Sequence, residues 1–499
     1  MAEKVYDLLV IGGGINGCGI AADAAARGLS VLLVEAEDLA GATSSASSKL
    51  IHGGLRYLEH FEFRLVREAL AEREVLLVNA PHIVHPLRFI LPQVAGMRPA
   101  LMMRAGLFLY DHLAVRKSLG QSRAIDLLID PAGIPLVPEI DSGFSYWDCA
   151  VDDARLVVLN AIAARQSGAD LETRTPVTRL AAENGLWVAT RGSDSRQCVA
   201  RAVVNAAGPW VAEVAKLTPT PHPEPPITVR LVKGSHIVVP RIQGADDAYT
   251  FQNQDGRVVF ALPFEDDFTL IGTTEENTSC DPRHVAPTSD EVRYLLDVCN
   301  RFFRERRTLR DIVWSFAGVR PLDEDGSRNA SAVTRDYRLK LDAEHTPPIL
   351  HVVGGKITTH RRLAEAALTL LQPYFPQMKP GHTSSTPLPG GDLAGRSFED
   401  WFTDFARRHS AFASDFLRRL ARRYGTRSIK IIGNARSETD LGDDFGAGLT
   451  AREVEYLKAE EWARTAEDVL WRRTKTGLHL APGDRTKAAE RIQARLDRS

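Results

Sequence analysis

The first forty residues alternate between short apolar runs and glycine-rich turns. Residues 6–11 are apolar and end at three consecutive glycines, residues 20–27 are rich in alanine, and residues 31–34 form a second apolar run that ends in Glu35. A short apolar run bounded by glycine is typical of a buried strand, and an alanine-rich stretch favours a helix. The order strand, turn, helix, strand predicts the start of a parallel α/β sheet.

Two later apolar runs repeat the strand-to-turn pattern. Residues 202–210 (AVVNAAGPW) and 350–356 (LHVVGGK) each predict a buried strand that ends in a turn of small residues. The second run is followed by a helical stretch at 361–371. Residues 121–140 and 244–311 give only mixed strand and turn signals.

The last quarter of the chain has a different pattern. Residues 373–395 are rich in Pro, Gly, Ser and Thr and predict a linker. Residues 398–424 and 451–473 then show helical periodicity with good helix formers. Residues 401–430 carry eight basic residues against two acidic ones. We expect a solvated helix face there, with a subunit contact or a membrane-facing patch as alternatives.

The glycines after the first strand have the spacing of a dinucleotide fingerprint, Gly12-x-Gly14-x-x-Gly17. The first glycine makes the turn, the second lets the backbone approach a pyrophosphate, and the third lets the helix pack on the strand. The pyrophosphate would lie at the helix N-terminus, where free N–H groups and the helix dipole favour an anion. Glu35 would accept hydrogen bonds from an adenosine ribose, and its charge disfavours a 2′-phosphate.

The later turns favour FAD over a nicotinamide cofactor. The turn within 202–210 would close over the cofactor, and the helix that starts near Thr358 could direct its positive end at the flavin and stabilise the reduced ring. The polar loop 43–49 (TSSASSK) could wrap the ribityl chain, although alone it is typical of an exposed turn. The sequence has no second Gly-x-Gly-x-x-Gly, so we expect no separate nicotinamide site.

Composition limits the other classes of protein. A chain of 499 residues is too long for a single domain with one hydrophobic core. Its content of 44% hydrophobic and 25% charged residues is typical of globular domains. A formal net charge of −2 gives no global basic field, so we expect no nucleic-acid partner. The five cysteines form no C-x-x-C pair, so we expect no metal site, no disulfide framework and a cytoplasmic location. No stretch approaches the roughly 20 apolar residues of a membrane-spanning helix.

Several long motifs are more specific than the fingerprint. They are GATSSASSKLIHGGLRYLEHFEFRLVREALAEREVLL (41–77), KGSHIVVP (233–240), IGTTE (271–275), WSFAGVRPL (314–322), TRDY (334–337), GGKITTHRRLAE (354–365), LGDDFG (441–446) and LWRRTKTG (470–477). With these motifs the sequence closely resembles the flavin-dependent, membrane-associated glycerol-3-phosphate dehydrogenases. The match extends over nearly the whole chain.

The resemblance implies an α/β fold of three parts. These are a glutathione-reductase-like FAD-binding (Rossmann) domain, an inserted mixed-sheet substrate domain and an all-helical C-terminal domain. The expected boundaries are 1–80, 150–225 and 330–372 for the FAD-binding domain, 81–149 and 226–329 for the substrate domain, 373–395 for the linker and 396–499 for the helical domain.

The resemblance also implies an activity. The enzyme would oxidise sn-glycerol 3-phosphate to dihydroxyacetone phosphate, with hydride transfer from C2 to flavin N5 and electrons passed on to membrane quinone. It would be a homodimer held peripherally at the inner face of the cytoplasmic membrane.

A phosphate monoester requires several cations, and arginine suits it best because its guanidinium binds oxygens in pairs. Taken singly, an arginine beside a turn is typical of a solvated surface charge. By resemblance, the substrate pocket should contain Arg56, Tyr57, Arg320, Arg335 and Lys356, with Arg320 and Arg335 favoured for the phosphate. Lys356 could stabilise reduced flavin or a developing alkoxide.

Oxidation of a secondary alcohol also requires an acceptor for the hydroxyl proton, and histidine is the first candidate. His52 and His236 lie in matched motifs, and either could instead be a structural histidine bonded to a backbone carbonyl. We prefer His236, since His52 is expected against the flavin. The catalytic candidates are therefore His236, Arg320 and Lys356.

The expected FAD-binding residues come from the fingerprint, the polar loop, the later turns and the resemblance. They are Gly12, Gly14, Ile15, Asn16, Gly17, Glu35, Thr43, Ser44, Ser48, Lys49, Leu50, His52, Val177, Gly208, Gly355, Lys356 and Thr358.

Residues 86–117 are the candidate for membrane contact. They carry five Lys or Arg residues against one acid, interleaved with apolar side chains. This pattern suits a segment that lies in the lipid headgroups, and a helix that packs between domains is the alternative.

Three rival functions share these features. An amine or amino-acid oxidase on the same scaffold would bind a carboxylate and would need only one arginine fork. A glycerol-3-phosphate oxidase would use oxygen as its acceptor. A non-catalytic flavin sensor would bind FAD without being reduced by the substrate.

Overall fold

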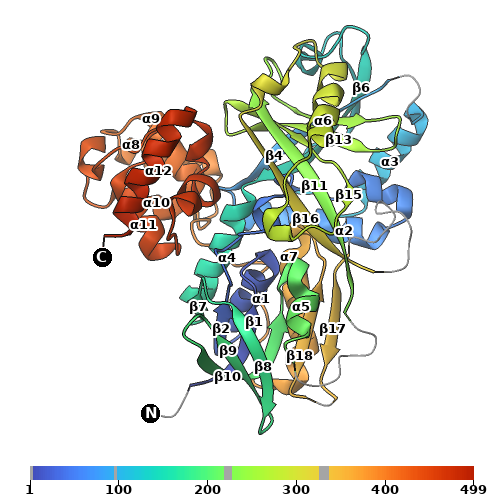
Figure 1. Cartoon of the computed structure of the whole chain (residues 1–499). Helices are drawn as coiled ribbons and strands as arrows, with labels where there is room; N and C mark the ends of the chain where they lie inside the picture. Colours follow the sequence, from blue (N-terminus) through green and yellow to red (C-terminus); the bar gives the residue numbers. More distant parts are fainter. Residues whose placement is uncertain (1–3, 95–97, 219–226, 325–335, 345, 499) are drawn as a thin grey trace.

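The computed structural model describes residues 4–94, 98–218, 227–324, 336–344 and 346–498. Two β-sheets lie one above the other, and a group of helices lies to one side of both (Figure 1). The three predicted parts of the fold are confirmed. The long apolar strands and the amphipathic helices each bury one face or both in these layers.

The eight-stranded sheet contains the amino-terminal pattern. Its order is β17-β18-β10-β1-β2-β7, with β9 beside β10 and β8 beside β9, and β1 pairs in parallel with both β2 and β10. Its strands are β1 (Val5–Ile11), β2 (Val31–Val34), β7 (Asp170–Glu172), β8 (Val177–Glu183), β9 (Leu186–Arg191), β10 (Arg196–Asn205), β17 (Arg338–Asp342) and β18 (Ile349–Val353).

Both faces of this sheet are covered, which explains its unbroken apolar runs. Alternate residues of β1 enter two different cores: Leu8 and Val10 face the helices, and Leu9 and Ile11 face the β8–β9 side. The helices on the first face are α1 (Ile15–Ala26), α4 (Asp153–Gln166) and α7 (His360–Leu371), and the short α5 (Val211–Ala215) packs beside β18.

The second sheet has ten strands and makes up the inserted domain. Its order is β15-β11-β14-β13-β12-β4-β6-β3, with β16 beside β11 and β5 beside β6. Its strands are β3 (Leu50–Ile51), β4 (Val84–Pro92), β5 (Arg123–Asp126), β6 (Ser142–Val151), β11 (Val229–Pro240), β12 (Ala248–Gln252), β13 (Val258–Phe264), β14 (Phe268–Gly272), β15 (Glu276–Asn277) and β16 (Trp314–Asp323).

Helices cover this sheet too, and one of them lies where we expected only strands and turns. α2 (Phe63–Asn79) and α3 (Ala100–His112) cover one face, and α6 (Ser289–Phe302) covers the other. α6 lies within the stretch in which we expected only strands and turns. Its start is marked by a capping box between Thr288 and Glu291, a local signal that the sequence does contain.

The segment predicted for membrane contact is divided between two elements. Its first part, from Pro86, is in β4, an inner strand between β6 and β12, so that part of the prediction is wrong. Arg88 there forms ion pairs with Asp130 and Asp247. α3 presents apolar side chains to solvent, with Leu101 80% and Phe108 64% exposed, and Val115 after its end is 78% exposed.

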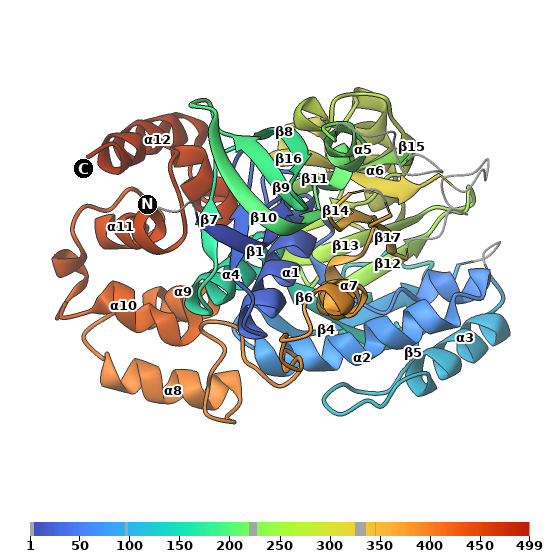
Figure 2. The same ribbon diagram turned by 90° about the horizontal axis from the view of Figure 1, so that it is seen from below.

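The C-terminal helices form a domain with its own core, seen on one side of the two sheets in both ribbon views (Figures 1 and 2). They are α8 (Phe398–Arg408), α9 (Ser414–Tyr424), α10 (Ser428–Ile432), α11 (Ala451–Glu460), a π-helical turn at Asp468–Arg473 and α12 (Pro482–Leu496). Much of the predicted basic face is paired with acids of this domain: Arg419 and Arg423 both contact the buried Glu453.

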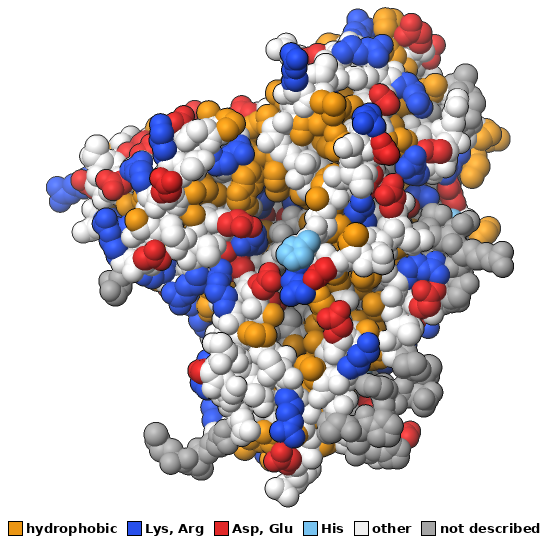
Figure 3. Space-filling view, viewed as in Figure 1, with side chains coloured by type: hydrophobic (Ala, Val, Ile, Leu, Met, Phe, Trp, Pro, Cys, Tyr) orange, Lys and Arg blue, Asp and Glu red, His pale blue; other side chains and the backbone are white. Residues whose placement is uncertain are grey.

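The segment predicted as a linker packs against the FAD-binding domain. Phe375 and Met378 are buried in the core beneath the first sheet, and the Lys379 N–H donates to the Arg27 carbonyl at 3.0 Å. Charged side chains of both signs are interspersed over the face of the molecule in Figure 3. Within the described ranges, no helix has the length and apolar character needed to cross a bilayer.

Candidate active site

A cavity of about 520 Å³ lies between the two sheets, a size typical of ligand pockets. The glycine turns of the first sheet line one end. Strands β13 and β16 of the second sheet, with the loop before β3, line the other. The layered fold therefore brings together segments from the first sixty residues and from residues 206–358.

At the nucleotide end, two fingerprint glycines are required by close packing. A Cβ on Gly12, whose φ is +115°, would lie 2.5 Å from the Ala206 carbonyl oxygen. A Cβ on Gly17 would lie 1.9 Å from the Gly12 carbonyl oxygen. Gly17 is not part of the cavity lining, and its assignment to FAD binding stays a prediction. It has the predicted packing role of letting α1 approach β1.

Gly14 supplies an open approach to the start of α1. It is the N-cap of the helix, has no side chain to cap it, and lines the cavity together with Ile15 and Asn16. The Ile15 N–H donates to the Ser44 hydroxyl at 3.1 Å. A helix N-terminus at a cavity wall fits a pyrophosphate.

Glu35 lines the cavity at the end of β2, as predicted. One carboxylate oxygen accepts a hydrogen bond from the Gly13 N–H at 2.6 Å, and the other accepts from the Glu37 N–H at 2.8 Å. Burial raises the pKa of this carboxyl group, and the two backbone donors oppose that effect. The carboxylate thus fixes the glycine turn and still faces the place expected for a ribose.

The polar loop lies at the cavity, and its contact with the ribityl chain stays a prediction. Thr43, Ser44 and Ser48 line the cavity, and the Thr43 hydroxyl donates to the Val319 carbonyl oxygen at 2.6 Å. Lys49 is not part of the cavity lining, and its assignment to FAD binding stays a prediction. Its ammonium group is buried and donates to both Asp153 carboxylate oxygens, at 2.9 and 3.0 Å.

The other expected cofactor residues line the same cavity. They are Leu50, His52, Val177, Gly208, Gly355, Lys356 and Thr358. The glycine cradle, the uncapped helix start and the polar loop form one continuous lining, so the residues present fit FAD.

The cationic side chains gather at the end of the cavity near His52. Arg56, Tyr57, Arg320 and Lys356 all line it, and the Lys356 ammonium nitrogen lies 3.6 Å from the centre of the Tyr57 ring. A Cβ on Gly54 would lie 2.2 Å from this ring, so a glycine is needed for the tyrosine to fold over the lysine. Arg335, also expected here, lies outside the described residues.

Glu275 is the site residue that sequence reasoning missed. Its carboxylate lies between the two arginines, 3.4 Å from Arg56 Nη1 and 3.9 Å from Arg320 Nη1. The motif IGTTE ends at this glutamate, but an acid in a pocket for a phosphate has no obvious local signal. Glu275 can hold the two guanidinium groups in place before a ligand binds. This role becomes visible only when the folded structure brings the three side chains together.

His236 lies behind the cavity wall and does not line it. Its ring is buried, stacks on Phe316 with the ring centres 4.9 Å apart, and its Nε2 is 2.9 Å from the Ser48 hydroxyl. Burial, together with the positive charges of Arg320 and Lys49, lowers its pKa well below the ordinary value. This placement argues against the preferred role of His236 as the base, because a base must reach the proton that it removes.

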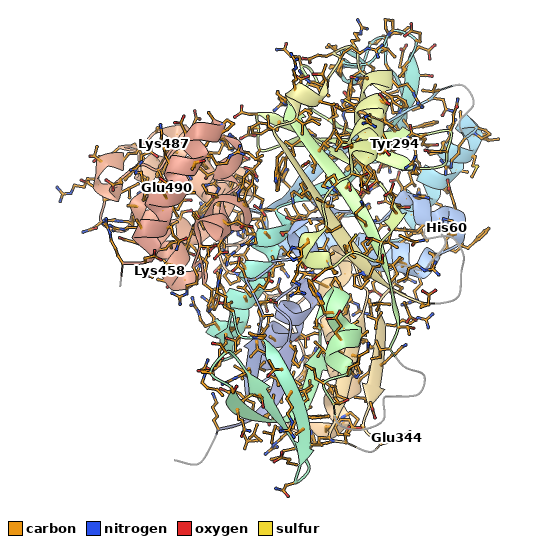
Figure 4. All side chains as sticks on the ribbon, in the orientation of Figure 1. His60, Tyr294, Glu344, Lys458, Lys487 and Glu490 are labelled. Atoms are coloured by element: carbon orange, nitrogen blue, oxygen red, sulfur yellow. The ribbon has the colours of Figure 1, made fainter. Side chains whose placement is uncertain are left out.

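His52 does face the cavity. Its backbone N–H donates to the Thr358 hydroxyl at 3.3 Å, and its ring lies edge-on to Phe260 with the centres 6.3 Å apart. The cavity extends beyond it to Arg98, Gln252 and His60. Figure 4 shows His60 on the side of the molecule away from the C-terminal helices.

A family model described as FAD dependent oxidoreductase matches residues 7–361. The chain belongs to this family of FAD-dependent oxidoreductases. A second model, described as the C-terminal domain of alpha-glycerophosphate oxidase, matches residues 381–496 of this FAD-dependent oxidoreductase.

Curated relatives of this oxidoreductase match along nearly its whole length. A glycerol-3-phosphate dehydrogenase of Pseudomonas aeruginosa is 53% identical, over 98% of this chain and 96% of its own. The aerobic glycerol-3-phosphate dehydrogenase of Escherichia coli is 49% identical, over 98% and 97%. A D-erythritol 1-phosphate dehydrogenase of Brucella abortus is also 49% identical, over 98% of each chain.

A solved structure agrees with this assignment. The glycerol-3-phosphate dehydrogenase of Bacillus halodurans complexed with FAD has a TM-score of 0.75 and 25% identity to this oxidoreductase. The match covers 99% of this chain and 95% of the other. The FAD dependence predicted from the glycine turns is thereby confirmed.

Proposed function

We propose that this FAD-dependent oxidoreductase oxidises sn-glycerol 3-phosphate to dihydroxyacetone phosphate. The observation that carries the proposal is the group of Arg56, Arg320 and Lys356 at one end of the FAD cavity. An amino-acid oxidase would need one guanidinium for a carboxylate, whereas a phosphate monoester with nearly two negative charges matches several cations. The names of the Pseudomonas and Escherichia relatives support the same substrate.

The phosphate would bind between Arg56 and Arg320. Glu275 holds both guanidinium groups at the cavity wall, so little ordering remains to be done when the substrate binds. The side chains of both arginines are about a quarter exposed, and both line the cavity. Arg335 would add to this group, as the resemblance implies.

The substrate hydroxyl would lie between His52 and Lys356. Bound FAD supplies the acceptor for the hydride that leaves C2. His52 lines the cavity and is the side chain that we now assign as acceptor of the hydroxyl proton. The ammonium group of Lys356, held over the Tyr57 ring, would stabilise negative charge that develops on the oxygen.

D-erythritol 1-phosphate is the second candidate substrate. The Brucella relative named for it is as similar to this chain as the Escherichia enzyme is. It shares the phosphate and the secondary alcohol and adds one carbon with its hydroxyl. The cavity beyond His52, lined by Thr250, Gln252 and Tyr146, offers polar partners for that hydroxyl.

An anaerobic titration tests both substrates. The absorbance of oxidised flavin at about 450 nm should disappear when sn-glycerol 3-phosphate is added. It should not change with glycerol or glycine. A stronger response to D-erythritol 1-phosphate would assign the tetritol phosphate instead. Flavin that neither phosphate reduces would overturn the proposal and leave the sensor alternative. Peroxide formation in air would identify oxygen as the acceptor.

Transfer of electrons to membrane quinone, peripheral association with the cytoplasmic membrane and a homodimer complete the proposal. They are supported by the resemblance and, for the membrane, by the outer face of α3. Leu101, Met102 and Phe108 are exposed there, with Arg104 beside them. An apolar helix face flanked by cations suits the boundary between headgroups and acyl chains.

The double variant Leu101→Ser/Phe108→Ser should lose binding to vesicles that contain anionic lipid, because each serine removes apolar area from the contact. Dye-coupled activity should stay within about twofold of the parent, since neither residue lines the cavity. Ile429→Ser is the matched control, an exposed apolar side chain of the C-terminal domain. Unchanged vesicle binding by the double variant would exclude α3 as the anchor.

A further inference from the structure

The segment Asp468–His479 joins the C-terminal domain to the back of the FAD cavity. It contains the whole motif LWRRTKTG, to which the proposed chemistry assigns no role. Arg473, Lys475 and Thr476 are almost fully buried, although this segment lies more than four hundred residues from the loop that it contacts. Buried cations at a domain junction remain charged only when they are paired.

The first contact fixes the start of the cofactor loop. The Arg473 guanidinium donates from Nη1 and Nη2 to the two oxygens of the buried Asp38, both at 2.8 Å, and Arg472 Nε donates to the same carboxylate at 2.6 Å. The Asp38 carbonyl oxygen accepts from the Gly41 N–H, and the Ala40 N–H donates to the Gly13 carbonyl. Asp38 thus connects the C-terminal segment to the fingerprint turn.

The second contact fixes the end of the same loop. Lys475 Nζ donates to Asp152 Oδ1 at 2.5 Å, and the other role of Asp152 is to cap α4. The next residue, Asp153, accepts from the Ser47 N–H and hydroxyl, at 3.2 and 2.7 Å, and from Lys49. Carboxylates therefore hold the loop 38–49 at both ends. Asp38 at its start pairs directly with segment 468–479, and Asp153 at its end is next to Asp152, which pairs with Lys475.

A third contact connects the segment to the substrate domain. Trp471 stacks on Trp314 at the start of β16, with the ring centres 4.9 Å apart. β16 continues to Arg320 at the cavity. One short segment of the C-terminal domain thus contacts both elements that enclose the cofactor.

We propose that segment 468–479 positions the loop 38–49 for FAD and that Arg473 and Lys475 are its positioning residues. Neither side chain lines the cavity, so both act through Asp38 and Asp152. A loop that is already ordered loses less freedom when the cofactor binds, which raises affinity. Removing one partner of a buried pair leaves the other charge uncompensated, so the loop would shift to hydrate it.

Equilibrium binding of FAD to the full-length apoprotein, followed by quenching of flavin fluorescence, tests the proposal. Arg473→Gln, Arg472→Gln and Lys475→Met should each raise the Kd for FAD at least about fivefold, the lower end of typical coupling between sites. Arg427→Gln is the matched control. It removes a buried arginine that pairs with Glu460 inside the C-terminal domain and does not contact the loop.

Hydrogen exchange of the apoproteins supplies a second measurement. Amides of residues 38–49 should exchange faster in the three variants than in the parent and in Arg427→Gln. If Arg473→Gln does not fold, the test uses Arg472→Gln and Lys475→Met. Arg472 is partly exposed and Lys475 pairs with Asp152, so each substitution removes less buried pairing than Arg473→Gln does. A Kd within about twofold of the parent for folded Arg472→Gln and Lys475→Met, or an equal rise in the control, would overturn the proposal.

Discussion

At the scale of single residues, two histidines have different access to the reacting centre. His52 lines the cavity, whereas His236 is buried behind Ser48 and stacked on Phe316. Burial and the positive charges of Arg320 and Lys49 lower the pKa of His236 well below its ordinary value, which favours the neutral ring. It therefore supports the cavity wall and should contribute no titration near neutral pH.

His52→Asn should lower kcat by about 10²–10⁴, the usual contribution of a general base, and should remove the acidic limb of the kcat/KM profile. His236→Asn should leave that limb in place, although the loss of ring packing costs stability. Steady-state kinetics on FAD-saturated protein, from about pH 5.5 to about pH 9, checks both expectations. Loss of the limb in His236→Asn together with its survival in His52→Asn would return the base to His236.

At the scale of elements, two glycines of the turn between β1 and α1 have different structural roles. Gly17 lets helix and strand approach, while Gly14 leaves space in front of the helix N-terminus. A Cβ on Gly14 would meet only the Ser44 hydroxyl, at 3.2 Å, whereas one on Gly17 would overlap the Gly12 carbonyl. The two positions can therefore be separated by the same substitution.

Gly17→Ala should destabilise the apoprotein by about 1–3 kcal/mol or more, because helix and strand must move apart. Gly14→Ala should leave the melting temperature of the apoprotein within a few degrees of the parent but weaken FAD binding about tenfold or more, since its methyl group occupies the approach to the pyrophosphate. Thermal unfolding and FAD titration of the two apoproteins measure both effects. Equal loss of Tm in the two variants would contradict this division.

The element scale also shows how far sequence patterns reach. The fingerprint strand, helix and second strand, the strand before residue 206 and helix α7 all form where they were predicted, because each is set by neighbours in sequence. β4 was misread because Arg88 stands among its apolar residues. Arg88 is neutralised by Asp130 and Asp247, which lie far away in the chain. α6 was overlooked although Thr288 and Glu291 mark its start.

At the scale of the whole molecule, buried histidines make stability depend on pH. Burial lowers the pKa of His82 to about 3 and those of His351 and His360 to about 4. His82 lies where the FAD-binding domain meets the C-terminal domain, against Gly390 and Gly425. In the unfolded chain these rings would take up protons near pH 6.5, but in the folded protein they do so only in stronger acid.

The free energy of unfolding should therefore fall as the pH is lowered from 7.5 to 5. The unfolded state binds more protons over this range, and each such histidine contributes a loss of about 2 kcal/mol at pH 5. His82→Asn should show a shallower dependence than the parent in urea unfolding at the two pH values. His284→Asn, at an exposed position, is the control. Identical slopes for the parent and His82→Asn would contradict the assignment.

The sequence by itself determined the local chemistry: the glycine turn for a pyrophosphate, the FAD dependence, and cations such as Arg56 and Lys356 beside turns. These follow from sterics and hydrogen bonding among residues close in the chain. Only the tertiary structure decided that Lys49 turns to Asp153, that His236 lies behind Ser48, and that Glu275 joins two arginines. Except for Glu275 and Arg320, those partners are separated by about a hundred residues or more. Their meeting depends on how the sheets and helices pack together, which no local pattern specifies.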